Sequence, residues 1–195
     1  TNSETLAQGT SGGGEVKIIA SQSLTLESQS KINVSAIDNG NGGSIKTSAP
    51  QTLLAGQLEA HGGGITGKGG LIETQADNLN ITDTAQVAAI SRDQVNAEGQ
   101  WIMNLPHLTM TQNIAALISS TLKDTNVQLN VYRSSFDLLK DQIIEKISGI
   151  KTAFEIHSKT QMNIAGNISS DTTAPLDLIL KSYESILVSA SSTVH

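Results

Sequence analysis

The chain has 195 residues, with 12 Lys and Arg against 18 Asp and Glu, a net charge of −6 and no cysteine. The acidic balance argues against nucleic acid as a partner, because nothing would neutralise a run of phosphates, and the missing thiols exclude disulfides and thiolate metal sites. Aromatic residues make up only 3%, which fits a narrow interior filled by aliphatic side chains better than an ordinary globular core.

A pattern repeats three times in the first hundred residues, each copy holding a glycine pair followed by short alternating runs. The pairs Gly13-Gly14, Gly42-Gly43 and Gly69-Gly70 recur after 29 and 27 residues (13 to 42, 42 to 69). Repetition at a fixed period of roughly 20–50 residues is typical of solenoids, and alternating apolar residues predict strands. Three short strands per copy predict the coils of a parallel β-helix.

Less regular runs continue this pattern to the end of the chain. The first inward apolar residues define about seven coils of 24 to 30 residues, starting at Val16, Ile45, Ile72, Ile102, Val127, Phe154 and Leu178. We therefore expect an all-β fold, a parallel β-helix with three strands per coil, over residues 1–195 as one segment of a longer chain. Regular coils occupy 1–111, less regular coils 112–150 and the final coils 151–195.

One stretch departs from the strand pattern. Its apolar residues are spaced as on one face of a helix: Phe136, Leu139, Ile143 and Ile147. We expect a short helical excursion near 135–147 on the side of the rod, and a shorter helical turn at 115–123. The polar residues of the excursion are the candidate contacts for a partner: Asp137, Lys140, Asp141 and Glu145. The alternative is a solvated turn that covers apolar surface.

Motifs for chemistry are weak. Residues 62–69 nearly match a phosphate loop, but Gly69 replaces the Ser or Thr that holds magnesium and a predicted strand follows. We interpret this loop as a glycine-rich corner. The four histidines, His61, His107, His157 and His195, lack metal-ligand spacing. No carboxylate cluster with a basic residue suits a β-helical lyase. We predict no catalytic residue, cofactor or metal, and no membrane span, because no run of about 18 apolar residues exists.

Several segments in a fixed order resemble one family. Residues 67–74, 78–81 and 100–106 resemble segments of large two-partner-secretion exoproteins, the filamentous-haemagglutinin-like and high-molecular-weight adhesins of Gram-negative bacteria. The family carries a GKGG-x-hydrophobic-E-T-S segment and a later Trp-Leu-Leu-Asp-Pro segment; Gln75 replaces the Ser here, and Met103-Asn104-Leu105-Pro106 stands where Leu-Asp-Pro is usual. Residues 118–127 and 162–168 are similar to further family segments, so the resemblance covers roughly 40–190.

The resemblance implies a right-handed parallel β-helix that is secreted through an outer-membrane transporter and exposed at the bacterial surface. It implies an adhesin whose partner is a host-cell receptor or glycan. A passive shaft of a contact-dependent toxin-delivery exoprotein is the alternative, and a polysaccharide-degrading β-helix is a third reading. Some of these adhesins are glycosylated at N-x-S/T sequons, which here begin at Asn33, Asn80 and Asn167.

Overall fold

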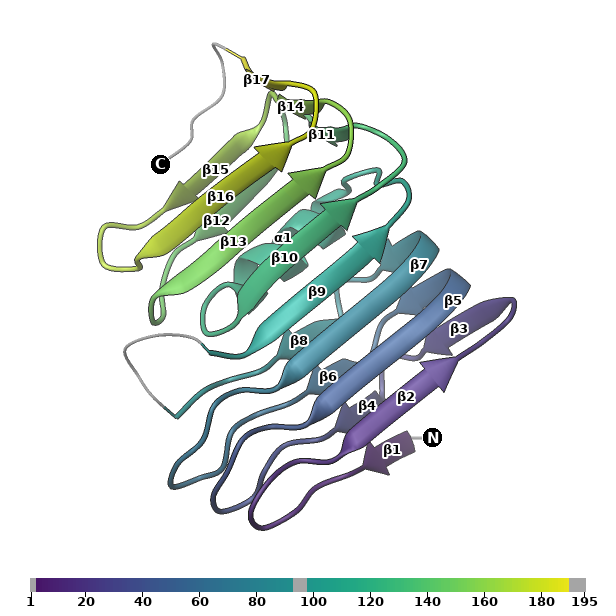
Figure 1. The fold of residues 1–195 in the computed structure, drawn as a ribbon, viewed down its shortest axis with the longest axis vertical. Coiled ribbons are helices and arrows are strands. Elements are labelled where there is room, and N and C mark those ends of the chain that lie inside the picture. Colours follow the sequence, from purple (N-terminus) through teal and green to yellow (C-terminus); the bar gives the residue numbers. More distant parts are fainter. Residues whose placement is uncertain (1–2, 93–97, 190–195) are drawn as a thin grey trace.

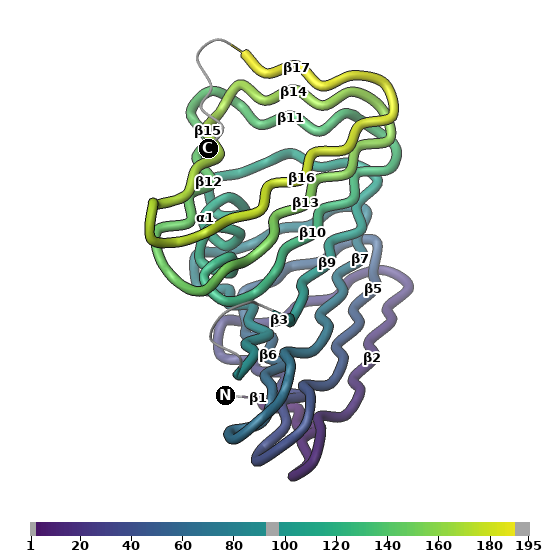
Figure 2. Tube along the Cα trace, turned by 60° about the vertical axis from the view of Figure 1, so that its left-hand side comes forward, coloured from purple at the N-terminus to yellow at the C-terminus, as the bar shows by residue number. Residues whose placement is uncertain are grey.

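The structure is a computed structural model, and it describes residues 3–92 and 98–189. Over these ranges the chain winds into a parallel β-solenoid of about seven turns (Figure 1). The turns follow one another in chain order from the N-terminal to the C-terminal end of the stack (Figure 2). The predicted all-β parallel β-helix is confirmed.

One wall of the solenoid is an eight-stranded sheet in which every pairing between the described strands is parallel. Seven of these strands come from successive turns: β2 (Glu15–Ile19), β5 (Ser44–Leu54), β7 (Leu71–Ile81), β9 (Gln100–Leu105), β10 (Asn126–Val131), β13 (Thr152–Ser158) and β16 (Leu176–Ser182). The eighth, β3 (Ser23–Leu26), joins because β2 and β3 pair with successive halves of the long strand β5.

Shorter strands build the remaining sides of the turns. Near the N-terminal end, a four-stranded sheet holds β1 (Ser3–Leu6), β4 (Ser30–Asn33), β6 (Gln57–Glu59) and β8 (Gln86–Ala88). Near the C-terminal end, one sheet holds β11 (Phe136–Leu138), β14 (Met162–Ile164) and β17 (Ile186–Val188), and another holds β12 (Ile143–Lys146) and β15 (Asn167–Ser170).

The coil starts stack in register along the eight-stranded sheet, with one correction. The aligned residues are Val16, Ile45, Ile72, Trp101, Val127, Phe154 and Leu178. The expected start at Ile102 was wrong by one residue, because Trp101 is fully buried whereas Ile102 lies on the outer face beside Glu73 and Gln128. A one-residue shift exchanges the faces of a strand, and three consecutive apolar residues concealed which of them points inward.

A second inward column changes character along the stack. Its members are Ile18, Thr47, Thr74, Met103, Leu129, Ile156 and Leu180. Thr47 and Thr74 are the small members of this column, and the Nε1 of Trp101 donates a hydrogen bond to the Oγ1 of Thr74 (3.2 Å). A buried indole normally needs such an acceptor, and from Met103 onward every member of the column is larger and apolar.

The helical excursion expected near 135–147 is absent, because this segment forms the strands β11 and β12. The side chains that suggested a helical face are mostly outside, with Leu139, Ile143 and Ile147 more than half exposed. Alternate residues such as Leu138 and Ile144 are buried instead, which is the period of a strand. The prediction failed because exposed aliphatic side chains imitated a helical stripe.

The helix of the described chain is α1 (Gln112–Thr121), close to the shorter helical turn expected at 115–123. Thr111 caps it, since its Oγ1 accepts a hydrogen bond from the N–H of Ile114. The helix packs against β8 on one side and β12 on the other, and it occupies the place between them in the stack (Figure 1). Ile114, Leu117 and Ile118 bury its inner face.

A lysine completes the core beneath this helix. Lys146, on β12, is fully buried, and its Nζ donates to the carbonyl oxygens of Leu122 (2.7 Å), Lys123 (3.1 Å) and Ser148 (3.1 Å). Leu122 is the C-cap of α1, so the ammonium lies at the negative end of the helix dipole. Burial lowers the pKa of Lys146, and the charge of Asp124 opposes that shift.

Candidate functional site

The residues predicted to contact a partner do not share one face. Asp137 lies on β11, where its carboxylate accepts hydrogen bonds from Ser135 Oγ (2.6 Å) and Asn163 Nδ2 (2.6 Å). Lys140 and Asp141 are exposed in the turn between β11 and β12, and Glu145 is exposed on β12. The four side chains therefore spread around one corner of a turn, and their role in binding stays a prediction.

The three sequon asparagines differ in accessibility. Asn33 is only 8% exposed, and its Oδ1 accepts a hydrogen bond from the N–H of Ser35 (2.9 Å). Asn80 is exposed on β7, and Asn167 is half-buried on β15. Glycosylation stays a prediction for all three, and on the folded chain Asn80 offers the most accessible acceptor.

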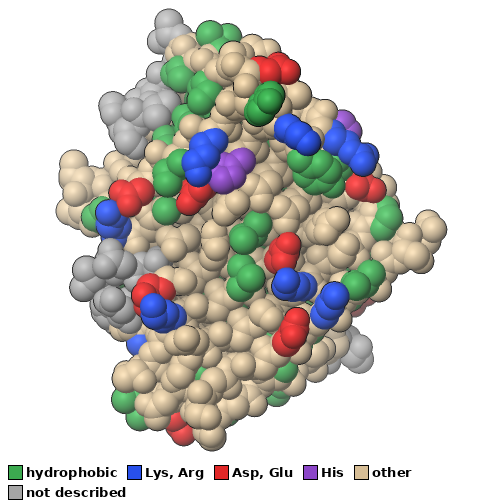
Figure 3. Space-filling view, in the orientation of Figure 1, with side chains coloured by type: hydrophobic (Ala, Val, Ile, Leu, Met, Phe, Trp, Pro, Cys, Tyr) green, Lys and Arg blue, Asp and Glu red, His purple; other side chains and the backbone are tan. Residues whose placement is uncertain are grey.

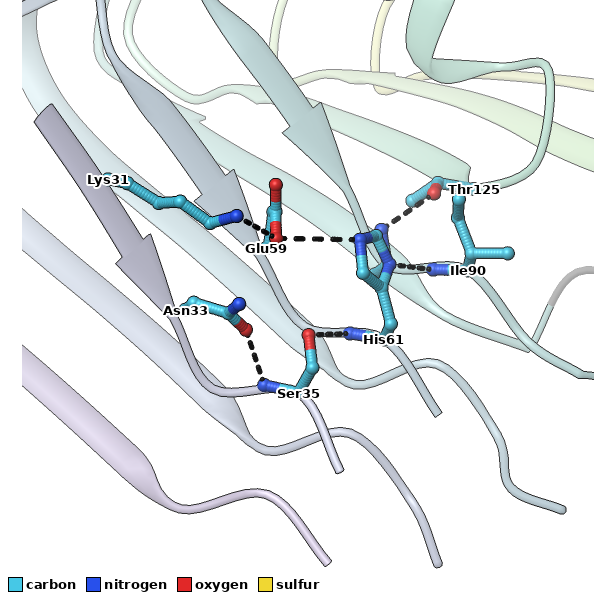
Figure 4. Close-up of polar contacts among 8 residues, drawn as sticks. Lys31, Asn33, Ser35, Glu59, His61, Ile90 and Thr125 are labelled. Atoms are coloured by element: carbon cyan, nitrogen blue, oxygen red, sulfur yellow. Dashed lines mark hydrogen bonds and ion pairs between the residues drawn. The ribbon is translucent and has the colours of Figure 1, made fainter. Parts of the chain in front are cut away.

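His61 lies in a polar network beside the four-stranded sheet (Figure 4). The ring Nδ1 of His61 accepts a hydrogen bond from the backbone N–H of Ile90 (3.1 Å), and the backbone N–H of His61 donates to Ser35 Oγ (2.9 Å). The Oε2 of Glu59 lies 3.8 Å from its Nε2 and 2.9 Å from the Nζ of Lys31. The bond from Ile90 requires an unprotonated Nδ1, so the network holds the neutral imidazole with its proton on Nε2.

Burial lowers the pKa of His61, Glu59 opposes this, and the charges of Arg92 and Lys31 add to the lowering. Within residues 3–92 and 98–189, no three acidic or histidine side chains converge as metal ligands would. His195 lies outside the described residues. The His61 network therefore links neighbouring turns, and the described residues around it do not supply the ligand set of a metal site.

The glycine-rich loop at 62–69 leads into the strand β7. The helix N-terminus that a phosphate loop requires is therefore missing from this position. Lys68 forms an ion pair with Glu98 (2.9 Å) across the corner, as expected for a structural turn. No helix in the described part of the chain is long and apolar enough to cross a membrane.

Amide side chains form a hydrogen-bonded ladder on the outer face of the eight-stranded sheet. Gln100 Nε2 donates to Gln128 Oε1 (3.1 Å), and Gln128 Nε2 donates to Asn130 Oδ1 (3.0 Å). Asn130 Nδ2 donates to Asn104 Oδ1 (2.8 Å), and Asn104 Nδ2 donates to Glu73 Oε1 (2.9 Å). This amide ladder crosses β7, β9 and β10 and fixes the side chains of three successive turns relative to one another.

Ion pairs extend the polar surface on both sides of the amide ladder. Lys46 Nζ lies 3.3 Å from Glu73 Oε2, and farther along the sheet Glu155 Oε2 lies 3.0 Å from His157 Nε2 and 3.6 Å from Lys181 Nζ. Figure 3 views this face and shows charges of both signs in mixed groups, separated by uncharged surface. The face is polar, ordered by contacts between side chains, and free of a large field of one sign.

A hollow of about 380 Å³ lies at the ends of β10, β13 and β16. Tyr132, Lys159 and Tyr183 line it together with His157 and Lys181. In the upper part of Figure 3, over the ends of these strands, positive, acidic and histidine side chains lie beside hydrophobic ones. We call this feature the corner hollow.

Sequence reasoning did not identify the corner hollow, although a signal for it was present. Tyr132, Lys159 and Tyr183 each follow their coil start by five residues (132 − 127, 159 − 154, 183 − 178). Residues at equal offsets in successive coils become neighbours when the coils stack in register. Comparing equal offsets, rather than runs along the sequence, would have placed two aromatic rings and an ammonium side by side.

Comparisons with models of known families, with curated proteins and with solved structures return no match for this chain. Arguments about its function therefore start from the β-solenoid and from the surface that its turns build.

Proposed function

We propose that this chain is a segment of a secreted or surface-exposed adhesin of a Gram-negative bacterium. In this proposal the β-solenoid is a rigid rod that presents a contact surface to host cells or other surfaces. Export would use an outer-membrane two-partner-secretion transporter, as the resemblance at residues 67–74 and 100–106 implies. The proposal assigns the chain a binding role and no catalytic step.

The observation that carries the proposal is the amide ladder on the outer face of the eight-stranded sheet. Rigid surfaces bind more tightly than mobile ones because fewer side chains lose freedom on contact. The side chains of Gln100, Gln128, Asn130 and Asn104 already hold one another in place, and each amide keeps donor or acceptor capacity beyond the bonds that it makes here. Such a face suits a partner with many hydroxyl and amide groups, as cell-surface glycans have.

A passive shaft is the second candidate, and the same amide ladder favours it in one respect. Stacked Asn and Gln side chains stabilise parallel strands without any partner, so the ladder would also stiffen a rod that only spans distance. The two candidates differ in whether the outer face binds anything.

Binding of the purified chain to epithelial cells and to a glycan panel separates the candidates. Replacing the segment 135–147, where the helical excursion was expected, is an unsuitable test because it would remove the core strands β11 and β12. A triple variant, Asn104→Ala, Gln128→Ala and Asn130→Ala, instead removes the ladder from the outer face.

The matched control is the variant Lys140→Ala and Asp141→Ala, which alters the exposed corner and leaves the ladder intact. We expect saturable binding that falls about tenfold in the ladder variant and persists in the control, with both variants showing native circular dichroism. Loss of binding only in the Lys140→Ala and Asp141→Ala variant would instead place the contact surface at the residues predicted from the sequence. No binding by the unchanged chain would support the passive shaft and contradict the proposal.

A further inference from the structure

We propose that the corner hollow binds a carboxylated saccharide, with pyranose rings on Tyr132 and Tyr183 and the carboxylate on Lys159. This inference rests on the proposed adhesive function, and it adds a defined site and a ligand class. The site lies beside the amide ladder at the end of the same outer face, so one extended ligand could contact both.

The register of the sheet builds the site. Val131, Ser158 and Ser182 are aligned partners at the ends of β10, β13 and β16. The next residues continue this alignment, because Lys159 N–H donates to Val131 O (3.0 Å) and Tyr183 N–H donates to Ser158 O (3.1 Å). Parallel strands lie about 4.8 Å apart, so the backbones of Tyr132 and Tyr183 are separated by about 10 Å, with Lys159 between them.

The two tyrosines provide apolar faces with polar ends. Tyr183 is 87% exposed and Tyr132 is half-buried, and both line the hollow. Such rings bind ligands that combine an apolar face with hydroxyl groups, because the ring packs on the face while the phenol hydroxyl exchanges hydrogen bonds. A pyranose has this construction, with C–H groups on its faces and hydroxyl groups around its edge. Two rings two turns apart therefore suit two sugar units of one oligosaccharide.

The charges around the hollow favour an anion. Lys159 forms no ion pair with any residue in the described ranges. Both Lys181 and His157 contact the carboxylate of Glu155. The guanidinium of Arg133 lies 5.9 Å from the centre of the Tyr132 ring.

The acidic residues beside the hollow do not cancel its cations. Arg133, Lys159 and Lys181 exceed Glu155 and Glu184 by one charge (3 − 2), although the whole chain carries −6. Lys159 and Tyr183 are exposed and Tyr132 is half-buried, so the ammonium of Lys159 is accessible to a ligand that packs on both rings. A carboxylate would complete a charge-assisted hydrogen bond there.

The test is calorimetric titration of the full 195-residue chain with trigalacturonic acid and with its methyl ester, which has the same rings without the charges. We expect saturable binding of the acid, about tenfold weaker binding of the ester, and weakening of acid binding by added salt. Sialyllactose and lactose form a second pair, which distinguishes a sialic-acid carboxylate from a uronic-acid carboxylate in the same site.

Point variants locate the site. Lys159→Gln and Tyr183→Ala change exposed side chains and should each weaken binding of the acid about tenfold, whereas Tyr183→Phe should retain most of it. Lys17→Gln makes the same charge change on an exposed lysine of β2 and should have no effect.

The outcomes separate this inference from the proposed function. Equal affinity for acid and ester, or acid binding that Lys159→Gln and Tyr183→Ala leave unchanged, would overturn the site. Binding to cells without binding of either acidic saccharide would also overturn the site, while the adhesive role would stand. Acid binding that depends on Tyr183 and Lys159 would support the site even if the chain did not bind the cells chosen.

Discussion

The turns formed by residues 15–91 and those formed by residues 100–188 share one register but fill their interiors differently. In the earlier turns, small side chains such as Thr47, Ala49 and Ala76 point inward, and glycine corners let successive backbones approach closely. In the later turns, the large side chains of Phe136 and Phe154 are fully buried, and α1 replaces a strand. The solenoid therefore accommodates two kinds of core, provided that the backbone hydrogen bonds of the eight-stranded sheet continue from turn to turn.

The largest expected effect comes from the polar part of the core in the later turns. Lys146→Met keeps the apolar stem but removes the donor to the carbonyls of Leu122, Lys123 and Ser148. A buried polar group without its partner costs about 1–3 kcal/mol, so we expect the free energy of unfolding to fall by about 3 kcal/mol in urea titrations.

The exposed Lys140→Met is the matched control for Lys146→Met, and it should change the free energy of unfolding by less than about 0.5 kcal/mol. If Lys146→Met were equally mild, the lysine would be replaceable by any side chain of its length. The later turns would then depend on apolar packing alone.

A methyl group at a glycine corner tests the earlier turns. In Gly43→Ala the new Cβ would lie 1.8 Å from the carbonyl oxygen of Gly14, whereas in Gly12→Ala the nearest atom is Asn41 O at 3.9 Å. The first contact forces neighbouring backbones apart, so we expect a loss of more than about 1 kcal/mol for Gly43→Ala and little change for Gly12→Ala. Similar urea midpoints for the two variants would show that the backbone at this glycine corner can shift to accommodate a methyl group. The contrast drawn between the earlier and the later turns would then be weaker.

The smallest effect concerns pH and again lies in the earlier turns. Burial lowers the pKa of His61 from its ordinary 6.5, so the unfolded chain binds this proton more readily than the folded chain. The contribution to stability is therefore complete above pH 6.5 and is lost as the pH falls below that value toward the folded pKa.

Urea midpoints at about pH 7.5 and about pH 5.5, on either side of an ordinary histidine pKa, measure this loss. We expect a smaller difference between the two pH values for His61→Gln than for the unchanged chain. The same difference in both proteins would mean that other groups cause the acid sensitivity.

The architecture could be predicted from the sequence because each turn of a solenoid repeats the same pattern of apolar residues and glycines. Alternation and the glycine pairs placed six of seven coil starts correctly, and only the run at Trp101 and Ile102 allowed two choices of face. The segment 135–147 could not be resolved in the same way, since its core includes a lysine and its surface includes Leu139 and Ile143. Hydrophobicity cannot assign an inward lysine whose partners are carbonyls brought close only by the fold.

The candidate site was harder to predict than the fold. The hydrogen bonds of the amide ladder between turns join residues 26 to 31 positions apart, such as Gln100 with Gln128 and Glu73 with Asn104. Those neighbours become visible only after the register is fixed to the residue, and the misplaced start at Ile102 would have paired the wrong side chains. The corner hollow depends on the same register at three later turns.

The chain has one tryptophan, and its position at the fourth of the seven aligned coil starts gives it a further use. Each turn of a solenoid contacts mainly its neighbours, so loosening can begin at either end and advance turn by turn. The Trp101 indole is fully buried, with Thr74 on one side and Val127 on the other. Its fluorescence would therefore not change until fraying from either end reached the middle of the stack. A change in its fluorescence thus reports that unwinding has reached the centre of the stack.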